Sequence, residues 1–319
     1  MADLRVRVAR IADEALEIRS FELVRADGGA LPGFAPGSHI DVHVTPDLVR
    51  QYSLCGRSDQ TGSYLIAVKR EPASRGGSLA MHERLKEGAE LTVSQPRNNF
   101  ALVASATHHL LVAGGIGVTP LLSMARHLLV AGASFELQYF SRSIQHTAFH
   151  KLLSAPEFKG KVALHYALEA EGVRAYLRKL LWHRANGSHL YLCGPRPFMD
   201  LVEATAAATW QPDAVHLEYF SADPASLAGP RDVFKVKLAR AGGEYTVSAD
   251  QSIVQALLAH GIAVETSCEQ GVCGTCLTGV LQGTPDHRDV FLTDAEKKAG
   301  DKIMPCVSRS MSDLLVLDL

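Results

Sequence analysis

The sequence predicts a multidomain α+β protein, because three segments with different residue patterns follow one another along the chain. The 319 residues exceed the usual size of a single domain. Short strand-like runs fill the first hundred residues, apolar strands alternate with helical stretches from about residue 108, and a cysteine cluster occupies the last sixth of the chain. These three patterns predict, in order, an antiparallel β-barrel, a parallel α/β sheet and a small unit that carries metal ligands.

The composition limits the possible partners. Hydrophobic residues make up 47% of the chain and charged residues 21%, as in an ordinary globular protein, and the net charge of −2 gives no electrostatic reason to bind nucleic acid or a membrane surface. The first twenty residues alternate charged with apolar residues, unlike a signal peptide, and no run approaches the ~18 apolar residues of a membrane span. We therefore expect a cytoplasmic monomer whose partners are small molecules and another protein.

The first segment, residues 1–104, is predicted to form the small antiparallel barrel. Its strand-like runs at 4–8, 39–44 and 64–68 are separated by Gly, Pro and Asp turns. His39, Asp41 and His43 share one face of the second run and suggest a metal site. The apolar opposite face explains this alternation as core-facing against solvent-facing, so we expect no metal there.

The second segment, residues 105–222, is predicted to form a parallel, doubly wound sheet. Apolar strands at 109–114, 135–140, 161–166 and 189–194 alternate with helical stretches such as 119–131 and 196–209. Thr119 is expected to cap the first of these helices, and Pro120 suits its first turn.

The third segment follows a predicted linker at residues 223–233, which is poor in bulky apolar residues and contains proline. Residues 234–319 are expected to form another domain, with strands at 234–238 and 245–248, a helix near 252–260 and a closing strand at 314–319.

The cysteine spacing in the third segment predicts an iron–sulfur cluster. Cys268, Cys273 and Cys276 lie in one loop and Cys306 follows at a distance, which is the ligand pattern of plant-type [2Fe–2S] proteins. Glycines at 271 and 274 allow the loop to wrap closely around a cluster. A structural zinc site is the alternative, although zinc usually takes its cysteines as two short pairs.

A phosphate site is predicted in the first segment. Arg50 and Tyr52 in "RQYSLC" share one face of an extended chain, so they could offer one ligand a cation and an aromatic ring. Further along, "RGGS" at 75–78 precedes a predicted helix, where bare backbone N–H groups and the helix dipole favour an anion. The alternatives are an ordinary exposed strand face for the first motif and, for the second, a Gly–Gly turn with Ser78 as helix N-cap.

A nucleotide site is predicted in the second segment. Gly114, Gly115 and Gly117 lie between an apolar strand and a helix, where a pyrophosphate binds in doubly wound sheets. The spacing is not that of the dinucleotide fingerprint GxGxxG, so the motif alone is only suggestive. Two later strands end in "YFSRS" and "YLCGPRPFM", which would reach the same edge of the sheet.

Several of these motifs resemble known families. The last ninety residues resemble a plant-type ferredoxin, a β-grasp fold with Cys268, Cys273, Cys276 and Cys306 as ligands, and "RQYSL" with "RGGS" resembles the flavin-binding barrel of the ferredoxin reductase superfamily. The resemblance implies that Arg50, Gly77 and Ser78 contact the flavin phosphate, that Tyr52 borders the isoalloxazine and that Ser53 lies near N5. The flavin-binding positions it implies are Arg50, Gln51, Tyr52, Ser53, Leu54, Ala67, Val68, Lys69, Gly76, Gly77 and Ser78. Cys55 is expected to be a packing residue, with a thiol beside the flavin as the alternative.

The glycine turn, "CGPRPFM" and "EYF" at 218–220 together resemble the NAD(P)H domain of that superfamily. The resemblance puts Cys193 beside the nicotinamide and Phe220 against the flavin ring, so Ser53, Cys193 and Phe220 are the implied catalytic residues. The alternatives are a core packing role for Cys193 and a linker anchor for Phe220. The implied nicotinamide-binding positions are Gly115, Gly117, Thr119, Pro120, Ser141, Arg142, Cys193, Gly194, Pro195 and Phe220.

The full length resembles the phthalate dioxygenase reductase and vanillate demethylase reductase family. This resemblance implies an enzyme that oxidises NADH, takes the hydride onto FMN and passes single electrons through a [2Fe–2S] cluster to a separate Rieske-type oxygenase that acts on an aromatic or similar small substrate. FAD is the alternative flavin, and NADPH the alternative coenzyme if Arg142 meets a 2′-phosphate. Two other functions stay open: a non-catalytic redox sensor or electron-transfer subunit, and a flavin or ferric reductase with free small-molecule acceptors.

Overall fold

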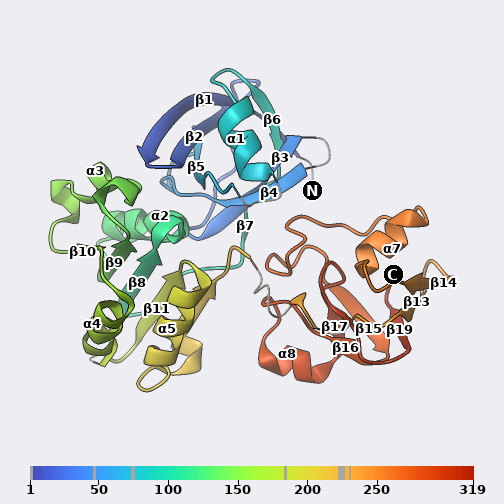
Figure 1. Ribbon diagram of the computed structural model, residues 1–319. Helices are drawn as coiled ribbons and strands as arrows, with labels where there is room; N and C mark the ends of the chain where they lie inside the picture. The colour runs from blue at the N-terminus through green and yellow to red at the C-terminus, as the bar shows by residue number, and fades with distance from the viewer. Residues whose placement is uncertain (1–2, 46–47, 73–75, 183–184, 222–226, 230) are drawn as a thin grey trace. The chain divides into compact units, whose positions relative to one another are not determined.

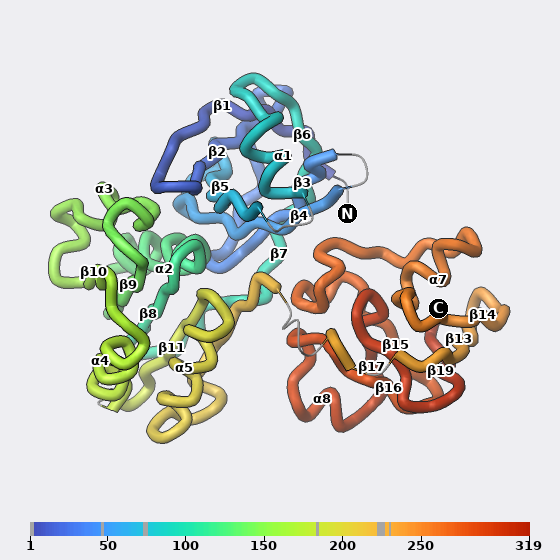
Figure 2. Tube along the Cα trace, viewed as in Figure 1, coloured from blue at the N-terminus to red at the C-terminus, as the bar shows by residue number. Residues whose placement is uncertain are grey.

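The computed structural model describes residues 3–45, 48–72, 76–182, 185–221, 227–229 and 231–319 (Figure 1). The chain divides into two compact units, Met1–Glu218 and Tyr219–Leu319. In the Cα trace of Figure 2 the first unit runs from blue to yellow and the second from orange to red. Each unit is described by itself below.

The first unit begins with a seven-stranded antiparallel sheet. Its strand order is β4-β3-β6-β1-β2-β5, with β7 paired to β3, and an isolated bridge from Leu54 to Ile66 links the two ends of this order. The predicted antiparallel sheet is confirmed, whereas a continuous ladder that closes it into a barrel is absent from the described strands. The strands are β1 (Leu4–Ala15), β2 (Ile18–Arg25), β3 (Ser38–Thr45), β4 (Leu48–Ser53), β5 (Tyr64–Lys69), β6 (Glu90–Val93) and β7 (Arg97–Asn98).

Strand β3 has both of its faces buried in its first half. Ile40 and Val42 are fully buried in the core of the sheet, as their alternation predicts. The expectation that the other face meets solvent is wrong, because His39 and Asp41 are only 4% and 6% exposed. The reason is that Arg97 of β7 covers this face and pairs with the Asp41 carboxylate.

A second sheet of the first unit is entirely parallel, with strand order β10-β9-β8-β11-β12, which confirms the predicted parallel sheet. Strands β9 and β10 lie on one side of β8, whereas β11 and β12 lie on the other side. The strand order therefore reverses between β8 and β11, which is the topological switch point of the sheet. The strands are β8 (His108–Gly114), β9 (Phe135–Ser141), β10 (Val162–Tyr166), β11 (Ser188–Cys193) and β12 (Val215–Glu218).

Helices cover both faces of the parallel sheet. Helix α2 (Val118–Val130) packs on the face that carries Leu111, Tyr139 and Tyr191, and it shares their core. On the opposite face Phe140 meets Tyr176 of α4 (Ala170–Trp182) and Phe198 of α5 (Arg196–Ala206). Shorter helical segments are η1 (Gly115–Gly117), η2 (Ile144–His146), α3 (His150–Leu153), η3 (Pro156–Phe158) and η4 (Pro212–Ala214).

The two sheets of the first unit share a hydrophobic core. Ile18, Cys55 and Ala67 from the antiparallel part pack in the same cluster as Leu121 and Met124 of α2. Residues on both sides of the predicted boundary at 104/105 therefore belong to one compact unit. The assignment of residues 1–104 and 105–222 to separate domains stays a prediction.

The second unit contains a mixed five-stranded sheet with strand order β14-β13-β19-β15-β17 and a two-stranded β16-β18 sheet. Ser252 and Thr293 each begin a helix with a capping box. The predicted strands and helix near residues 234–260 and the closing strand are confirmed. The elements are β13 (Phe234–Leu238), β14 (Glu244–Val247), α7 (Ile253–Ala259), β15 (Thr278–Gln282), β16 (Pro285–Asp286), α8 (Asp294–Ala299), β17 (Lys302–Ile303), β18 (Arg309–Ser310) and β19 (Leu314–Leu317).

Two buried arginines of the second unit bind parts of the predicted linker. Arg288, 4% exposed, donates to the carbonyl of Leu227 at 3.3 Å, and Arg309, 6% exposed, donates to the carbonyl of Asp232 at 2.9 Å. The described end of the linker is therefore held on the second unit. Residues 222–226 and 230 lie outside the described part of the chain.

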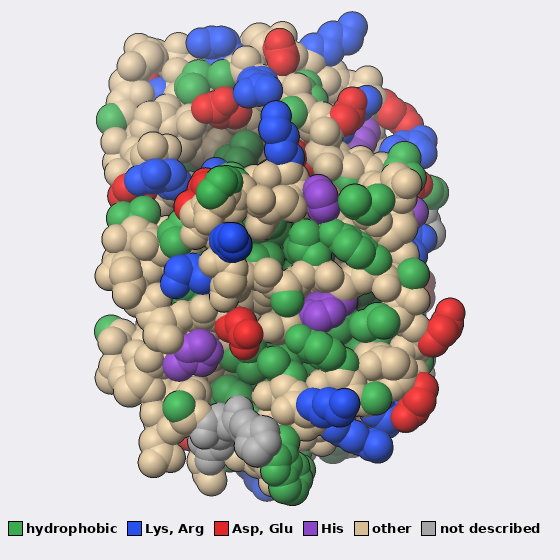
Figure 3. Space-filling view, turned by 90° about the vertical axis from the view of Figure 1, so that its left-hand side faces the viewer, with side chains coloured by type: hydrophobic (Ala, Val, Ile, Leu, Met, Phe, Trp, Pro, Cys, Tyr) green, Lys and Arg blue, Asp and Glu red, His purple; other side chains and the backbone are tan. Residues whose placement is uncertain are grey.

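The surface carries both signs of charge. On the face shown in Figure 3, Lys and Arg side chains lie among Asp, Glu, His and apolar side chains. Among the described residues, the helices are too short or too polar to cross a membrane.

Candidate redox site

Helix α1 (Gly77–Arg84) begins beside Arg50. Gly76, at φ +86°, precedes the helix, and a Cβ on Gly77 would lie 2.5 Å from the Arg50 Cγ, so the arginine side chain lies across the helix start. The alternative role of Ser78 as N-cap is wrong, because the helix is capped at Gly76. The hydroxyl of Ser78 instead bonds the backbone of Glu71. Arg75 lies outside the described residues.

Strand β4 divides the predicted flavin residues between its two faces. Tyr52 lies opposite Ile40 and Arg50 opposite Val42, so both point to the side of the buried core residues. Ser53 lies on the other face, opposite His39. The alternation of a regular strand therefore holds here, and a ligand contacted by Tyr52 and Ser53 together would lie across the end of β4.

The remaining predicted flavin residues flank this strand end. Gln51 donates to the Asp41 carboxylate at 3.1 Å, and Leu54 is fully buried at its bridge to Ile66. Ala67 and Val68 are buried in β5, whereas Lys69 pairs with Glu71 at 3.0 Å. Cys55 is a packing residue in this structure, since its thiol is buried and bonds the carbonyl of Leu65 at 3.3 Å, and burial raises its pKa to about 12.

In the glycine turn after β8, Gly114 and Gly117 are closely packed, whereas Gly115 has open space beside it. A Cβ on Gly117 would overlap the carbonyl of Cys193, and one on Gly114 would lie 2.8 Å from the Phe198 ring. Gly115 has φ +54° with no atom within 4 Å of a would-be Cβ, so its backbone is accessible. The predicted cap at Thr119 is wrong: Gly117 precedes the helix, and Thr119 donates to the carbonyl of Ile116 at 3.0 Å.

Three polar side chains meet where β11 and β12 end. Cys193 and Glu218 are direct neighbours on these parallel strands, and the Ser53 hydroxyl of β4 donates to Oε2 of the Glu218 carboxyl group at 3.4 Å. Burial raises the pKa of Glu218 to about 8 and that of Cys193 well above its usual range. At neutral pH the side chains of Glu218 and Cys193 are therefore both uncharged, although each is ionisable.

Glu218 is the residue that sequence reasoning missed. It lies within the quoted "EYF" motif, but only Phe220 was given a role there. The available signal was positional: Glu218 ends the strand that neighbours the Cys193 strand, and parallel strands end at one edge. A carboxyl group at that edge, beside two predicted catalytic residues, is a candidate for perturbed ionisation.

The other predicted nicotinamide residues are distributed around the same edge. Ser141 ends β9 and its hydroxyl bonds that of Thr147 at 2.7 Å, while the neighbouring Arg142 is exposed. Gly194 packs against Phe198, and Pro195 caps α5. Pro120 is buried in the first turn of α2.

Phe220 belongs to the second unit, where its side chain is 42% exposed. Its stacking on the flavin stays a prediction.

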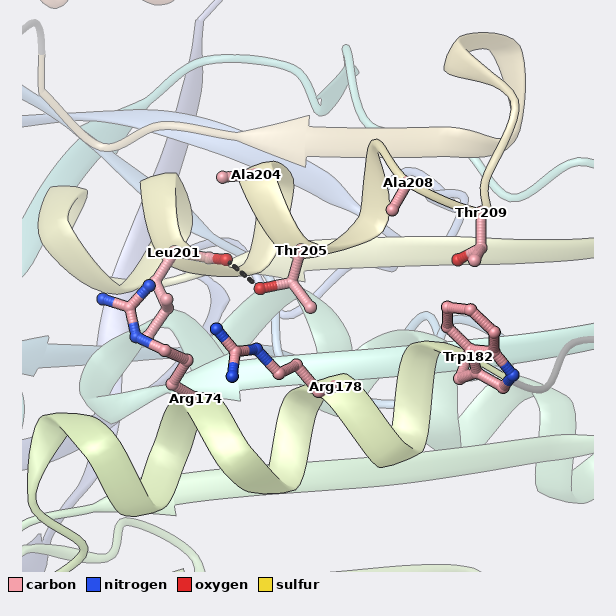
Figure 4. A pocket seen from close by; sticks show the side chains of 8 residues that line it. All are labelled: Arg174, Arg178, Trp182, Leu201, Ala204, Thr205, Ala208 and Thr209. Atoms are coloured by element: carbon pink, nitrogen blue, oxygen red, sulfur yellow. Dashed lines mark hydrogen bonds between the residues drawn. The ribbon is translucent and has the colours of Figure 1, made fainter.

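A separate hollow of about 380 Å³ lies between α4 and α5 (Figure 4). Arg174 and Arg178 extend from α4 toward α5, and Trp182 closes one end of the hollow. None of the predicted site residues lines it.

The four predicted cluster cysteines are buried as two contacting pairs. The Cys276 and Cys306 sulfurs are 3.2 Å apart, and the Cys268 and Cys273 thiols also share a hydrogen bond. That bond lowers the pKa of Cys273 to about 5, and Cys306 likewise lowers the pKa of Cys276. Two pairs fit a two-iron cluster, in which each iron takes two thiolates.

Glycines and backbone amides shape the cysteine loop. Gly271 and Gly274 have φ +69° and +78°, and a Cβ on Gly274 would overlap the ring of Phe291. The Gln270 N–H donates to the Cys268 sulfur at 3.3 Å, as expected of a loop that directs amides at cluster sulfur atoms. Among the described residues no group of three His, Cys, Asp or Glu side chains has the geometry to hold one metal ion.

Replacing Gly117 by alanine is expected to lower the free energy of unfolding of the first unit by about 1–3 kcal/mol, because the new Cβ overlaps the Cys193 carbonyl. Both tryptophans, Trp182 and Trp210, lie in this unit, so urea unfolding followed by their fluorescence measures the change. Gly33→Ala is the control, since nothing lies within 4 Å of its would-be Cβ. Equal losses in the two variants would contradict the packing role.

Replacing Glu218 by glutamine is expected to flatten the decline of stability with rising pH. The pKa of Glu218 is raised from 4.5 to about 8, so the folded state holds a proton that the unfolded state releases, and stability is lost as pH rises across this interval. One such group contributes at most about 1.4 kcal/mol per pH unit. Melting temperatures between pH 5 and pH 8 test this, with the exposed Glu157→Gln as control; parallel curves for Glu218→Gln and the unmodified protein would refute it.

Comparison with known proteins agrees with this geometry. Residues 236–311 match the model of the 2Fe-2S iron-sulfur cluster binding domain, and residues 91–215 match that of the dimethylamine monooxygenase subunit DmmA-like N-terminal domain. The chain is 47% identical to vanillate O-demethylase oxidoreductase of Pseudomonas putida, over 96% of this chain and 97% of that protein. It is 40% identical to phthalate dioxygenase reductase of Burkholderia cepacia, over 99% of this chain and 97% of that protein.

A solved structure gives the same result. The structure of phthalate dioxygenase reductase is described as a modular structure for electron transfer from pyridine nucleotides to [2Fe-2S]. The match covers 100% of this chain and 98% of that chain, at 39% sequence identity and a TM-score of 0.79. The paired cysteines, the cluster-domain match and this similarity over the whole length lead to one conclusion: the chain is an oxidoreductase and belongs to the family of vanillate O-demethylase and phthalate dioxygenase reductases.

Proposed function

We propose that the protein oxidises NADH, binds FMN as hydride acceptor and passes electrons singly through a [2Fe–2S] cluster to a separate Rieske-type oxygenase or demethylase of an aromatic or similar small substrate. The observation that carries this proposal is the meeting of Ser53, Cys193 and Glu218 at one sheet edge, in a chain whose second unit holds two cysteine pairs. A flavin supplies the step between a two-electron donor and a one-electron acceptor.

The phosphate of FMN would bind at the start of α1. Arg50 lies there as a cation, and the start of the helix is its positive dipole end, which favours an anion. Gly76 has open space beside it, which leaves room for a phosphate to approach the backbone. Ser78, whose hydroxyl bonds Glu71, would contribute through its own N–H group.

The reacting end of the flavin would lie where β4 and β12 approach each other. Tyr52 would border the ring from one face of β4, and Ser53 would reach its polar edge from the other. Glu218 keeps its proton at neutral pH, so it adds no fixed negative charge that would oppose the arrival of hydride. Cys193 is also neutral and offers the nicotinamide a small, polarisable neighbour.

NADH would bind across the carboxyl edge of the parallel sheet. Gly115 and the amino end of α2 would hold the pyrophosphate, and Ser141 with Arg142 would meet the adenosine ribose. Phe220 would cover the flavin and move aside as nicotinamide enters. The localisation that we propose for this enzyme is the cytoplasm.

The cluster would be the outlet for electrons. Cys268 with Cys273 would ligate one iron, and Cys276 with Cys306 the other. An oxygenase acceptor is favoured because the relatives are named as reductases of oxygenases and demethylases, among them those for phthalate and vanillate.

Mixing the purified protein with NADH in a stopped-flow instrument tests the first step. We expect rapid bleaching of flavin absorbance with NADH and slower bleaching with NADPH at equal concentration. An inert flavin would refute the enzyme and favour a redox sensor; faster bleaching with NADPH would reverse the assignment of coenzyme.

Replacing Cys306 by serine tests the order of the electron path. We expect loss of cluster absorbance and at least a hundredfold slower reduction of a protein acceptor such as cytochrome c, because one iron loses a thiolate. NADH-driven reduction of a small dye by the flavin should stay within about twofold of the unmodified protein. Cys55→Ser is the control, since this buried cysteine belongs to the first unit and is not one of the four cysteines of the predicted cluster.

Equal loss of dye reduction in a folded Cys306→Ser protein would show that electrons do not pass the flavin first. Unchanged reduction of both acceptors would instead favour a flavin reductase with free small-molecule acceptors.

A further inference from the structure

His39 lies on the same face of the sheet as the predicted catalytic residue Ser53. In the register of β3 and β4 these two residues are direct neighbours, and Arg97 of β7 lies opposite His39 on its other side. Side chains of directly opposed residues in an antiparallel sheet point to the same face. His39 therefore faces the side on which Ser53 meets Glu218, away from the core that holds Ile40.

The imidazole of His39 has an unfilled hydrogen-bonding position. Its Nε2 atom is buried without a hydrogen-bond partner, and the residue is only 4% exposed. A buried polar atom left in this way costs roughly 1–3 kcal/mol. Folded proteins rarely accept such a cost unless a water or ligand provides the missing partner.

The neighbouring side chains do not supply that partner in this structure. The Asp41 carboxylate accepts from Gln51 at 3.1 Å and from Arg97. The Nε of Arg97 is also buried without a hydrogen-bond partner. The Nε2 of His39 is therefore left outside the hydrogen bonds that join Gln51, Asp41 and Arg97.

Two other histidines have buried ring nitrogens without a hydrogen-bond partner, but they do not share this setting. His109 lies on β8 against the Tyr191 ring, and His287 belongs to the second unit. Only His39, among these described histidines, is the direct neighbour of a residue assigned to the flavin site.

We propose that His39 is a flavin-positioning residue, whose Nε2 forms a hydrogen bond with the polar edge of the isoalloxazine ring that Ser53 faces. This inference rests on the function proposed above. Burial and the nearby Arg97 lower the pKa of His39 to about 4, so the imidazole is neutral at working pH. A neutral imidazole can donate or accept through Nε2, and the carbonyl and nitrogen atoms of the isoalloxazine offer both kinds of partner.

The test is flavin affinity in a matched series of variants. His39→Phe keeps a planar ring but removes the hydrogen bond, and we expect it to weaken FMN binding about tenfold, which corresponds to ~1.4 kcal/mol. His39→Gln retains a polar group and should recover most of this loss. His109→Phe, which replaces the other buried histidine of the first unit, should change FMN affinity less than twofold.

Riboflavin, which has no phosphate, separates the ring from the phosphate contribution. His39→Phe should weaken riboflavin binding by the same factor as FMN, whereas Arg50→Ala should weaken FMN binding and leave riboflavin binding nearly unchanged. Fluorescence titration of the flavin-free protein measures all of these affinities.

The melting temperature of the flavin-free protein distinguishes positioning from a merely structural role. His39→Phe removes an unpartnered polar atom, so the flavin-free variant should melt at the same temperature as the unmodified protein or higher. A lower melting temperature with unchanged flavin affinity would overturn the proposal. Failure of the unmodified protein to bind FMN, FAD or riboflavin would instead refute the proposed function itself.

Discussion

The close approach of Gly117 to the carbonyl of Cys193 is the constraint on which the rest of the first unit depends. It allows α2 to begin directly against the end of β11, and it fixes the switch point of the parallel sheet at a place where the backbone is bare. The same contact sets the position of Cys193, and through strand pairing that of Glu218. The antiparallel part then reaches this edge through Ser53.

The second unit solves a different problem, which is to keep four thiols close together in a small fold. It does so with a loop in which Gly271 and Gly274 take left-handed conformations that favour glycine and lie close to Val307 and Phe291. The sulfurs are thereby grouped as two contacting pairs. Capping boxes at α7 and α8 and a buried Arg309 that binds three backbone carbonyls add local order around the small core.

The sequence was informative where chemistry or periodicity is local. Cysteine spacing identified the cluster loop, and apolar runs gave β8, β9, β10 and β11 of the parallel sheet with errors of a residue or so at their ends. Helix α4 was not predicted, because Arg and Glu interrupt its apolar pattern and only Leu177 and Leu181 are deeply buried. The cap at Thr119 was misplaced because a tight glycine turn starts the helix earlier than a side-chain cap would.

Long-range features were beyond the sequence for a physical reason. The burial of His39 and Asp41 depends on Arg97, which is distant in the chain, and alternation within one strand cannot reveal what covers its second face. The state of Glu218 depends likewise on burial by residues from both sheets.

The arginine bonds to Leu227 and Asp232 have a consequence for how far the two units can separate. Because Arg288 binds the Leu227 carbonyl, the chain is held on the second unit from Leu227 onward. Only the short covalent span between Glu218 and Leu227 then links the two units. A fully extended chain covers about 3.3–3.6 Å per residue, which limits the distance between these two residues to roughly 30 Å. The covalent link therefore sets an upper limit on the distance between these two residues that does not depend on the dilution of the protein.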